Sequence, residues 1–135
     1  MNYIHEIPMK VRDYECDLQG IVNNANYLHY LEHARHEFLL STGASFADLH
    51  ARGIDAVVSR ITLTYKVPLR SGDGFTCRLR LCREGIKYIF HQDIFRDSDQ
   101  RLSVRAVVEA VCLVDGRLSN SPELDALFAP YLPKP

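Results

Sequence analysis

One long helical pattern, set before a series of strand-like runs, limits the folds open to this chain. Apolar side chains recur at helical spacing after Asn23, a good N-cap candidate for which Asn24 is the alternative. Gly43 stands where a glycine typically follows the end of a helix. The spacing predicts one buried face made of Tyr27, Tyr30, Leu31, Ala34 and Phe38.

A second, shorter helix should follow at once. Ser45 and Asp48 resemble a capping box, with Asp in place of the usual Glu or Gln, and Gly53 can end the helix. Near the C-terminus, Ser121 and Pro122 favour the start of another short helix.

Most of the remaining chain has strand patterns. A first strand within residues 3–12 is expected to be interrupted near Pro8. Residues 60–67 alternate between polar and apolar side chains, which predicts a half-buried strand. Residues 106–114 are almost all apolar and predict a central strand covered on both faces. The three later strands are expected at residues 75–83, 87–96 and 102–114.

This order of elements predicts an α+β fold in one domain spanning residues 1–135. A long helix should lie on one face of an antiparallel sheet of about five strands. The remaining residues are too few to cover the other face of the sheet, so we expect association through a sheet edge or that open face.

The composition narrows the partners and the compartment. A formal net charge of −1 gives no reason to expect nucleic acid or an anionic membrane surface. No apolar run is long enough for stable membrane insertion, and the first residues lack a signal-peptide pattern. The four cysteines show no CxxC spacing, so we expect no zinc site and a reducing, cytoplasmic location.

The strongest chemical signal is Asp17, which comes shortly before Gly20 and the predicted helix start. An Asp-x-x-Gly segment alone more often forms a plain turn. Here, however, the carboxylate precedes unpaired backbone N–H groups at a helix N-terminus. Such N–H groups can stabilise an oxyanion, while the carboxylate attacks a carbonyl or activates water.

The segment running from Asp17 through Gly20, Ile21 and Val22 to Tyr27 resembles the start of the hotdog-fold acyl-CoA thioesterases. Further matches are the Glu32-x-Ala34-Arg35 pattern and the later stretch from Tyr65 through Pro68 to Gly72-Asp73. The chain is most similar to the group of 4-hydroxybenzoyl-CoA thioesterase and the small YbgC-like enzymes.

This resemblance implies a long helix wrapped by an antiparallel sheet, a homodimer or homotetramer, and active sites at the dimer interface. It implies hydrolysis of an acyl-CoA or acyl-carrier-protein thioester, without a cofactor or metal. Asp17 would be the nucleophile or general base, and the helix start near Asn24 would polarise the thioester carbonyl. The residues expected to bind substrate are Gly20, Ile21, Val22, Asn23 and Tyr27.

Other interpretations remain open. The chain could be a non-catalytic hotdog protein that binds acyl-CoA or acyl carrier protein. A hydratase is less favoured because the Asp17 segment contains no His.

Glu32 is a reserve catalyst, although pairing with Arg35 would explain it structurally. The sequence His29-Tyr30-Leu31-Glu32-His33 spells an inverted zinc-protease signature, but its histidines are expected on the solvent face or at a subunit contact. Basic residues along the strands could bind CoA phosphates, but a solvated sheet face explains most of them.

Overall fold

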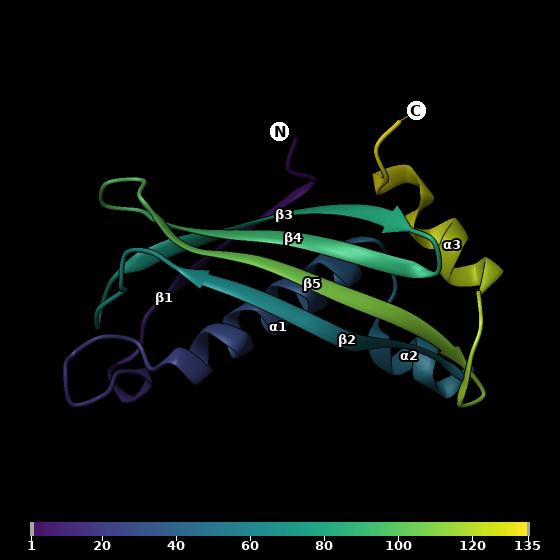
Figure 1. The fold of residues 1–135 in the computed structure, drawn as a ribbon, viewed down its shortest axis with the longest axis horizontal. Helices are drawn as coiled ribbons and strands as arrows, with labels where there is room; N and C mark the ends of the chain where they lie inside the picture. Colours follow the sequence, from purple (N-terminus) through teal and green to yellow (C-terminus); the bar gives the residue numbers. More distant parts are fainter. Residues whose placement is uncertain (1, 135) are drawn as a thin grey trace.

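The computed structural model describes residues 2–134 as a curved antiparallel sheet with a long helix across one face (Figure 1). The long helix α1 runs over Asn24–Ser41. The strand order is β1-β3-β4-β5-β2, with the short β6 paired to β5. The strands are β1 His5–Lys10, β2 Ile54–Tyr65, β3 Gly74–Glu84, β4 Lys87–Arg96, β5 Leu102–Val114 and β6 Arg117–Leu118.

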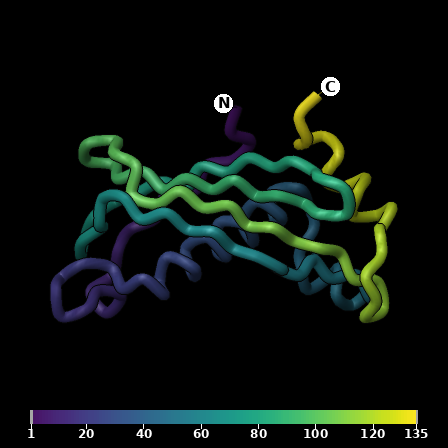
Figure 2. The backbone as a smooth tube through the Cα atoms, viewed as in Figure 1, coloured from purple at the N-terminus to yellow at the C-terminus, as the bar shows by residue number. Residues whose placement is uncertain are grey.

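Two short helices complete the fold at one end of the sheet, α2 at Phe46–Ala51 and α3 at Pro122–Phe128. At the other end, the loop before α1 lies near the end of β2, as the backbone path in Figure 2 shows. Two short 3-10 turns occupy Asp13–Glu15 and Ala129–Tyr131. None of the described helices is long and apolar enough to cross a membrane.

The long helix confirms the sequence prediction. The Asn23 side chain accepts a hydrogen bond from the Ala25 N–H at 3.0 Å, so Asn23 is the N-cap. Gly43 follows the helix end with a φ of +89°, a conformation that glycine adopts without strain. All five residues of the predicted apolar face are buried. The first four pack against inward-facing side chains of the sheet such as Phe75 and Ile94, whereas Phe38 belongs to a second cluster that includes Phe90.

Three strand predictions were wrong in detail. β1 is not interrupted at Pro8, because an edge strand tolerates a residue without an N–H and Pro8 pairs with Thr76 in register. β2 begins at Ile54 rather than near residue 60, and a register shift between Val58 and Arg60 breaks the alternation that would have revealed its first half.

The third wrong prediction is that residues 106–114, now part of β5, are covered on both faces. β5 is an interior strand, as predicted, with β4 and β2 on either side. The inward residues of β5 are buried, whereas its outward residues are half-buried or exposed, so only one face is covered.

A buried polar contact fixes α1 to the middle of the sheet. The Arg35 guanidinium donates to Gln92 Oε1 at 3.0 Å, and Gln92 Nε2 donates to the backbone carbonyl of Leu31 at 2.9 Å. Gln92 is fully buried and Arg35 nearly so, and burial lowers the pKa of Arg35. The predicted pairing of Glu32 with Arg35 is wrong, since Arg35 turns inward to Gln92.

Replacing Gln92 with Leu should lower the free energy of unfolding by about 3 kcal/mol, because it leaves a buried guanidinium without its acceptor. Urea denaturation measures this loss. The double variant Arg35→Met/Gln92→Leu should recover most of it, since an apolar pair replaces the polar one. A single variant as stable as the wild type would contradict this assignment.

Candidate functional site

The residues before α1 form a tight hairpin that carries Asp17. The Asp17 N–H donates to the Ile21 carbonyl at 2.9 Å, and Cys16 and Val22 form an antiparallel bridge. Gly20 turns the chain with a φ of +79°. Asp17 is exposed, and its Oδ1 accepts a hydrogen bond from the Gln19 N–H at 2.8 Å. Asp17 therefore has the turn-stabilising contact that an Asp-x-x-Gly segment predicts.

Glu15, which the sequence did not single out, joins this hairpin to the helix. Its carboxylate Oε1 accepts from the Arg12 N–H at 2.7 Å and from the Tyr30 hydroxyl at 2.9 Å. Its backbone carbonyl accepts from the Asn23 N–H at 2.9 Å and from Asn26 Nδ2 at 2.7 Å. Burial, followed by the contact with Glu15, raises the pKa of Tyr30, so its hydroxyl stays a donor.

The first turn of α1 keeps one open backbone donor. The Ala25 N–H is capped by the Asn23 side chain, and the Asn26 N–H donates to the Asn23 carbonyl. Within residues 2–134, no group accepts the N–H of Asn24, the first residue of the helix. Asn24 is exposed, so the positive end of the helix dipole is open to a ligand at this point.

A cavity of about 220 Å³ adjoins this open donor. Its lining combines the hairpin, the first turn of α1, the end of β2 and the segment that follows it. The lining residues are Ile21, Val22, Asn24, Tyr27, Tyr65, Lys66, Val67, Pro68 and Ser103. The Tyr27 and Tyr65 rings meet edge to face, with centroids 5.5 Å apart, and the Tyr27 hydroxyl accepts from the Leu69 N–H.

Comparison with known proteins assigns this arrangement to a family. Residues 11–128 match the thioesterase-like superfamily. The chain belongs to that superfamily. Its architecture is the hotdog fold that the sequence resemblance implied, with the antiparallel sheet curved around α1.

Three similar proteins illustrate the relationship. The acyl-acyl carrier protein thioesterase ATL3 of Arabidopsis thaliana is 39% identical over 84% of this chain and 60% of its own length. The long-chain acyl-CoA thioesterase FadM of Escherichia coli is 33% identical over 78% of this chain and 80% of its own length. The crystal structure of YbaW, a probable thioesterase from Escherichia coli, aligns with a TM-score of 0.81 at 28% identity, covering 93% of this chain and 97% of YbaW. The chain thus spans only about three fifths of ATL3.

The fold brings together some of the site residues that the sequence predicted. Ile21, Val22, Asn24 and Tyr27 line one cavity. Asn23 caps the helix beside it. Asp17 and Gly20 lie on the adjoining hairpin but do not line the cavity.

The sequence did not predict Ser103 as part of the lining, whereas Tyr65 to Pro68 lie in the stretch that resembles the family. Lys66, Val67, Pro68 and Ser103 are brought there by pairing between strands: the Lys66 N–H donates to the Ser103 carbonyl at 2.8 Å. Because this pairing joins residues far apart in the sequence, no local pattern predicts Ser103 at the cavity.

The remaining chemical motifs lie elsewhere. His29 and His33 face a groove beside β1, whereas His36 contacts Phe46 and lines a different cavity together with Glu32. Among the described residues, no group of three or more His, Cys, Asp or Glu is placed to hold a metal ion. Cys77 and Cys112 are buried in the sheet.

Replacing Glu15 with Ala should lower the free energy of unfolding by about 2 kcal/mol, because the Arg12 N–H and the Tyr30 hydroxyl lose their shared acceptor. Thermal unfolding and hydrogen exchange measure the effect, and amides in the first turn of α1 should exchange faster. Glu15→Gln, which keeps an oxygen acceptor, is the matched control and should cost less. Equal losses in the two variants would show that the acceptor oxygen does not hold the helix start.

Proposed function

We propose that this chain hydrolyses acyl thioesters of CoA or acyl carrier protein to a carboxylate and a free thiol. Membership of the thioesterase-like superfamily supports this class of reaction. The names of two relatives, the acyl-acyl carrier protein thioesterase ATL3 and the long-chain acyl-CoA thioesterase FadM, support these two thiol carriers. The segment from Asp17 through Gly20 to Tyr27 supports placement near 4-hydroxybenzoyl-CoA thioesterase and the YbgC-like enzymes.

The main support is the N–H of Asn24 at the positive end of an 18-residue helix, which finds no acceptor among residues 2–134. A thioester carbonyl that accepts this N–H becomes more electrophilic, and the same donor stabilises the oxyanion that forms on attack. The contacts of Glu15 with Asn23 and Asn26 hold this helix start in place before substrate binds. A donor positioned in advance needs no reorganisation during the reaction.

Asp17 is the proposed nucleophile or general base. As a base, its carboxylate removes a proton from water while the water oxygen bonds to the carbonyl carbon. The C–S bond then breaks, and the thiolate leaves and takes up a proton. As a nucleophile, the carboxylate displaces the thiolate itself, and water then cleaves the resulting anhydride. A thiolate leaves readily, so a carboxylate is strong enough for either route.

The acyl group is proposed to enter the cavity beside Asn24. Ile21, Val22 and the Tyr27 ring supply apolar surface, and the Tyr65 ring beside Tyr27 extends it. Lys66 at the same cavity offers a cation for an anionic part of the thiol carrier. Gly20 and Asn23 support this site through the turn and the helix cap.

A homodimer or homotetramer is proposed to complete the site. β2 is an edge strand of the described sheet, and most of its residues are exposed. Val57, Val58, Ile61 and Tyr65 are exposed apolar side chains on this strand. A second copy pairing with β2 would cover this apolar edge, which also borders the cavity.

Asp17→Asn should lower kcat/KM for the best thioester substrate at least about a hundredfold, because the amide neither attacks nor accepts a proton. Asn forms the same kind of turn through its side-chain oxygen, so the hairpin should remain folded. Release of free thiol, followed with a thiol reagent, measures the rate.

The matched control for this variant is Asp48→Asn, which removes an exposed carboxylate from α2 and should leave the rate unchanged. Wild-type kcat/KM in Asp17→Asn would remove Asp17 from the mechanism.

Asn24→Pro tests the open donor directly. Proline lacks the N–H but is well accepted at the first position of a helix, and the extended backbone of Asn23 suits a residue before proline. We expect kcat to fall about a hundredfold or more while the free energy of unfolding stays close to wild type. Thiol-release kinetics and urea denaturation measure the two quantities.

Asn24→Ala is the companion variant, because it keeps the backbone N–H and removes only the side chain. It should retain most of the activity. If Asn24→Ala lost as much activity as Asn24→Pro, the side chain rather than the N–H would be the operative group.

A further inference from the structure

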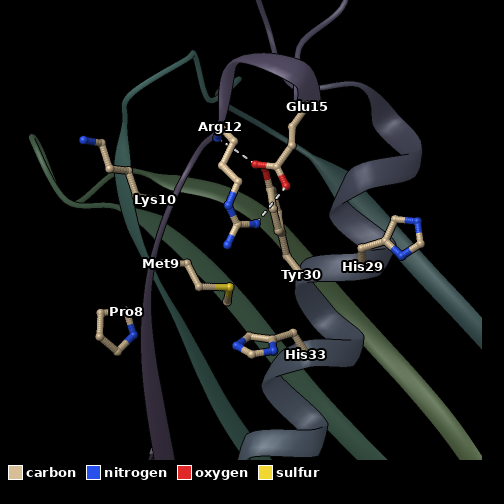
Figure 3. Close-up of a pocket in the computed structure, with 8 residues that line it drawn as sticks. All are labelled: Pro8, Met9, Lys10, Arg12, Glu15, His29, Tyr30 and His33. Carbon is tan, nitrogen blue, oxygen red and sulfur yellow. Dashed lines mark hydrogen bonds and ion pairs between the residues drawn. The ribbon is translucent and has the colours of Figure 1, made fainter.

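A second concavity lies on the other side of α1 from the candidate site, between the helix and β1 (Figure 3). Its volume is about 370 Å³, within the range of small-molecule sites. We call it the β1–α1 groove, lined by Met9, Lys10, Arg12, Glu15, Tyr30 and His33. None of these residues lines the cavity beside Asn24.

In Figure 3 the Arg12 guanidinium and the His33 ring lie on either side of the Met9 side chain, and both line the β1–α1 groove. Arg12 Nη1 lies 3.6 Å from Glu15 Oε2, a loose and partly exposed ion pair. Its other two guanidinium nitrogens have no hydrogen-bond or ion-pair partner among residues 2–134. The guanidinium therefore offers a planar pair of donors to an anion in the groove.

Glu15 does not favour a cationic ligand in the groove, because both of its carboxylate oxygens are already engaged. Its Oε1 already accepts two hydrogen bonds, from the Arg12 N–H and the Tyr30 hydroxyl, and its Oε2 faces Arg12. Lys10 and His29 stand at the rim, on the outer sides of β1 and α1. Lys10 points away from the groove, so the Arg12 guanidinium is the cation that a single carboxylate inside the groove can reach.

The space between these polar groups is apolar. The Met9 side chain projects into the groove, and the Tyr30 ring forms part of the wall beside it. A bare inorganic anion would leave this surface uncovered, whereas a short hydrocarbon body would pack against it. Methionine adapts easily to such a body because its side chain is unbranched and polarisable.

We propose that the β1–α1 groove binds a small organic monocarboxylate. Its carboxylate pairs with the Arg12 guanidinium, and its apolar body lies on Met9 and Tyr30, with His33 on the other side of Met9. This site is distinct from the proposed thioesterase site, and its occupation does not require thioester hydrolysis.

The NMR signal of the Met9 methyl group can report binding in the groove. The chain has two methionines, Met1 and Met9, so methyl-labelled methionine gives two signals, and Met9→Leu assigns them. Hexanoate should shift the Met9 methyl signal saturably in the millimolar range. Hexanamide, of the same shape but without charge, should shift it far less. No saturable shift with hexanoate, or equal shifts with both compounds, would overturn the proposal.

Arg12→Gln should weaken hexanoate binding about tenfold or more, because it removes a charged donor to the carboxylate. The backbone N–H that reaches Glu15 is kept, so the fold should persist. Arg117→Gln removes an exposed arginine from β6 and is the matched control, expected to titrate like wild type. An Arg12→Gln protein that also titrates like wild type would place the carboxylate elsewhere and refute the assignment. Neither compound is a thioester, so these outcomes are independent of the proposed hydrolysis.

Discussion

The contacts of Glu15 hold the candidate site together. One residue satisfies the Tyr30 hydroxyl and the Arg12 N–H with its side chain, and the Asn23 N–H and Asn26 amide with its carbonyl. These bonds place the hairpin that carries Asp17 against the first turn of α1. They also occupy the Asn23 N–H and the Asn26 amide, which would otherwise compete for a ligand. The Asn24 N–H then stays open at the helix start, with no acceptor among residues 2–134.

The position of this helix start depends in turn on packing and one buried polar contact. The apolar face of α1 lies on the sheet, and Arg35 and Gln92 tie the helix to the middle strand through the Leu31 carbonyl. The two faces of the first helical turns then have different surroundings. Tyr27 borders the cavity beside Asn24, and Tyr30 borders the β1–α1 groove. Their rings meet edge to face with centroids 5.9 Å apart, so the two concavities share one aromatic wall.

Local patterns predicted the helices well, because capping residues and helical spacing act within a few positions. Asn23, Gly43 and Ser45 behave as their residue types require. The start of β2 and the continuity of β1 through Pro8 were not predictable locally, because pairing with another strand decides both. The same limit applies to the site. Tyr27 and Asn24 follow from the helix, whereas Ser103 and Lys66 meet there only through the sheet. The contacts of Glu15 with Tyr30, Asn23 and Asn26 also form only in the fold.

We propose that this chain, with an open donor at Asn24 and a carboxylate at Asp17, turns over acyl thioesters. Incubation of the purified chain with a panel of short-chain, long-chain and aromatic acyl-CoA substrates, with free thiol measured over time, tests it most directly. We predict saturable, multiple-turnover thiol release with at least one member of the panel. Saturable binding of acyl-CoA with no thiol release above the uncatalysed rate would contradict the claim and identify a non-catalytic acyl-CoA-binding protein.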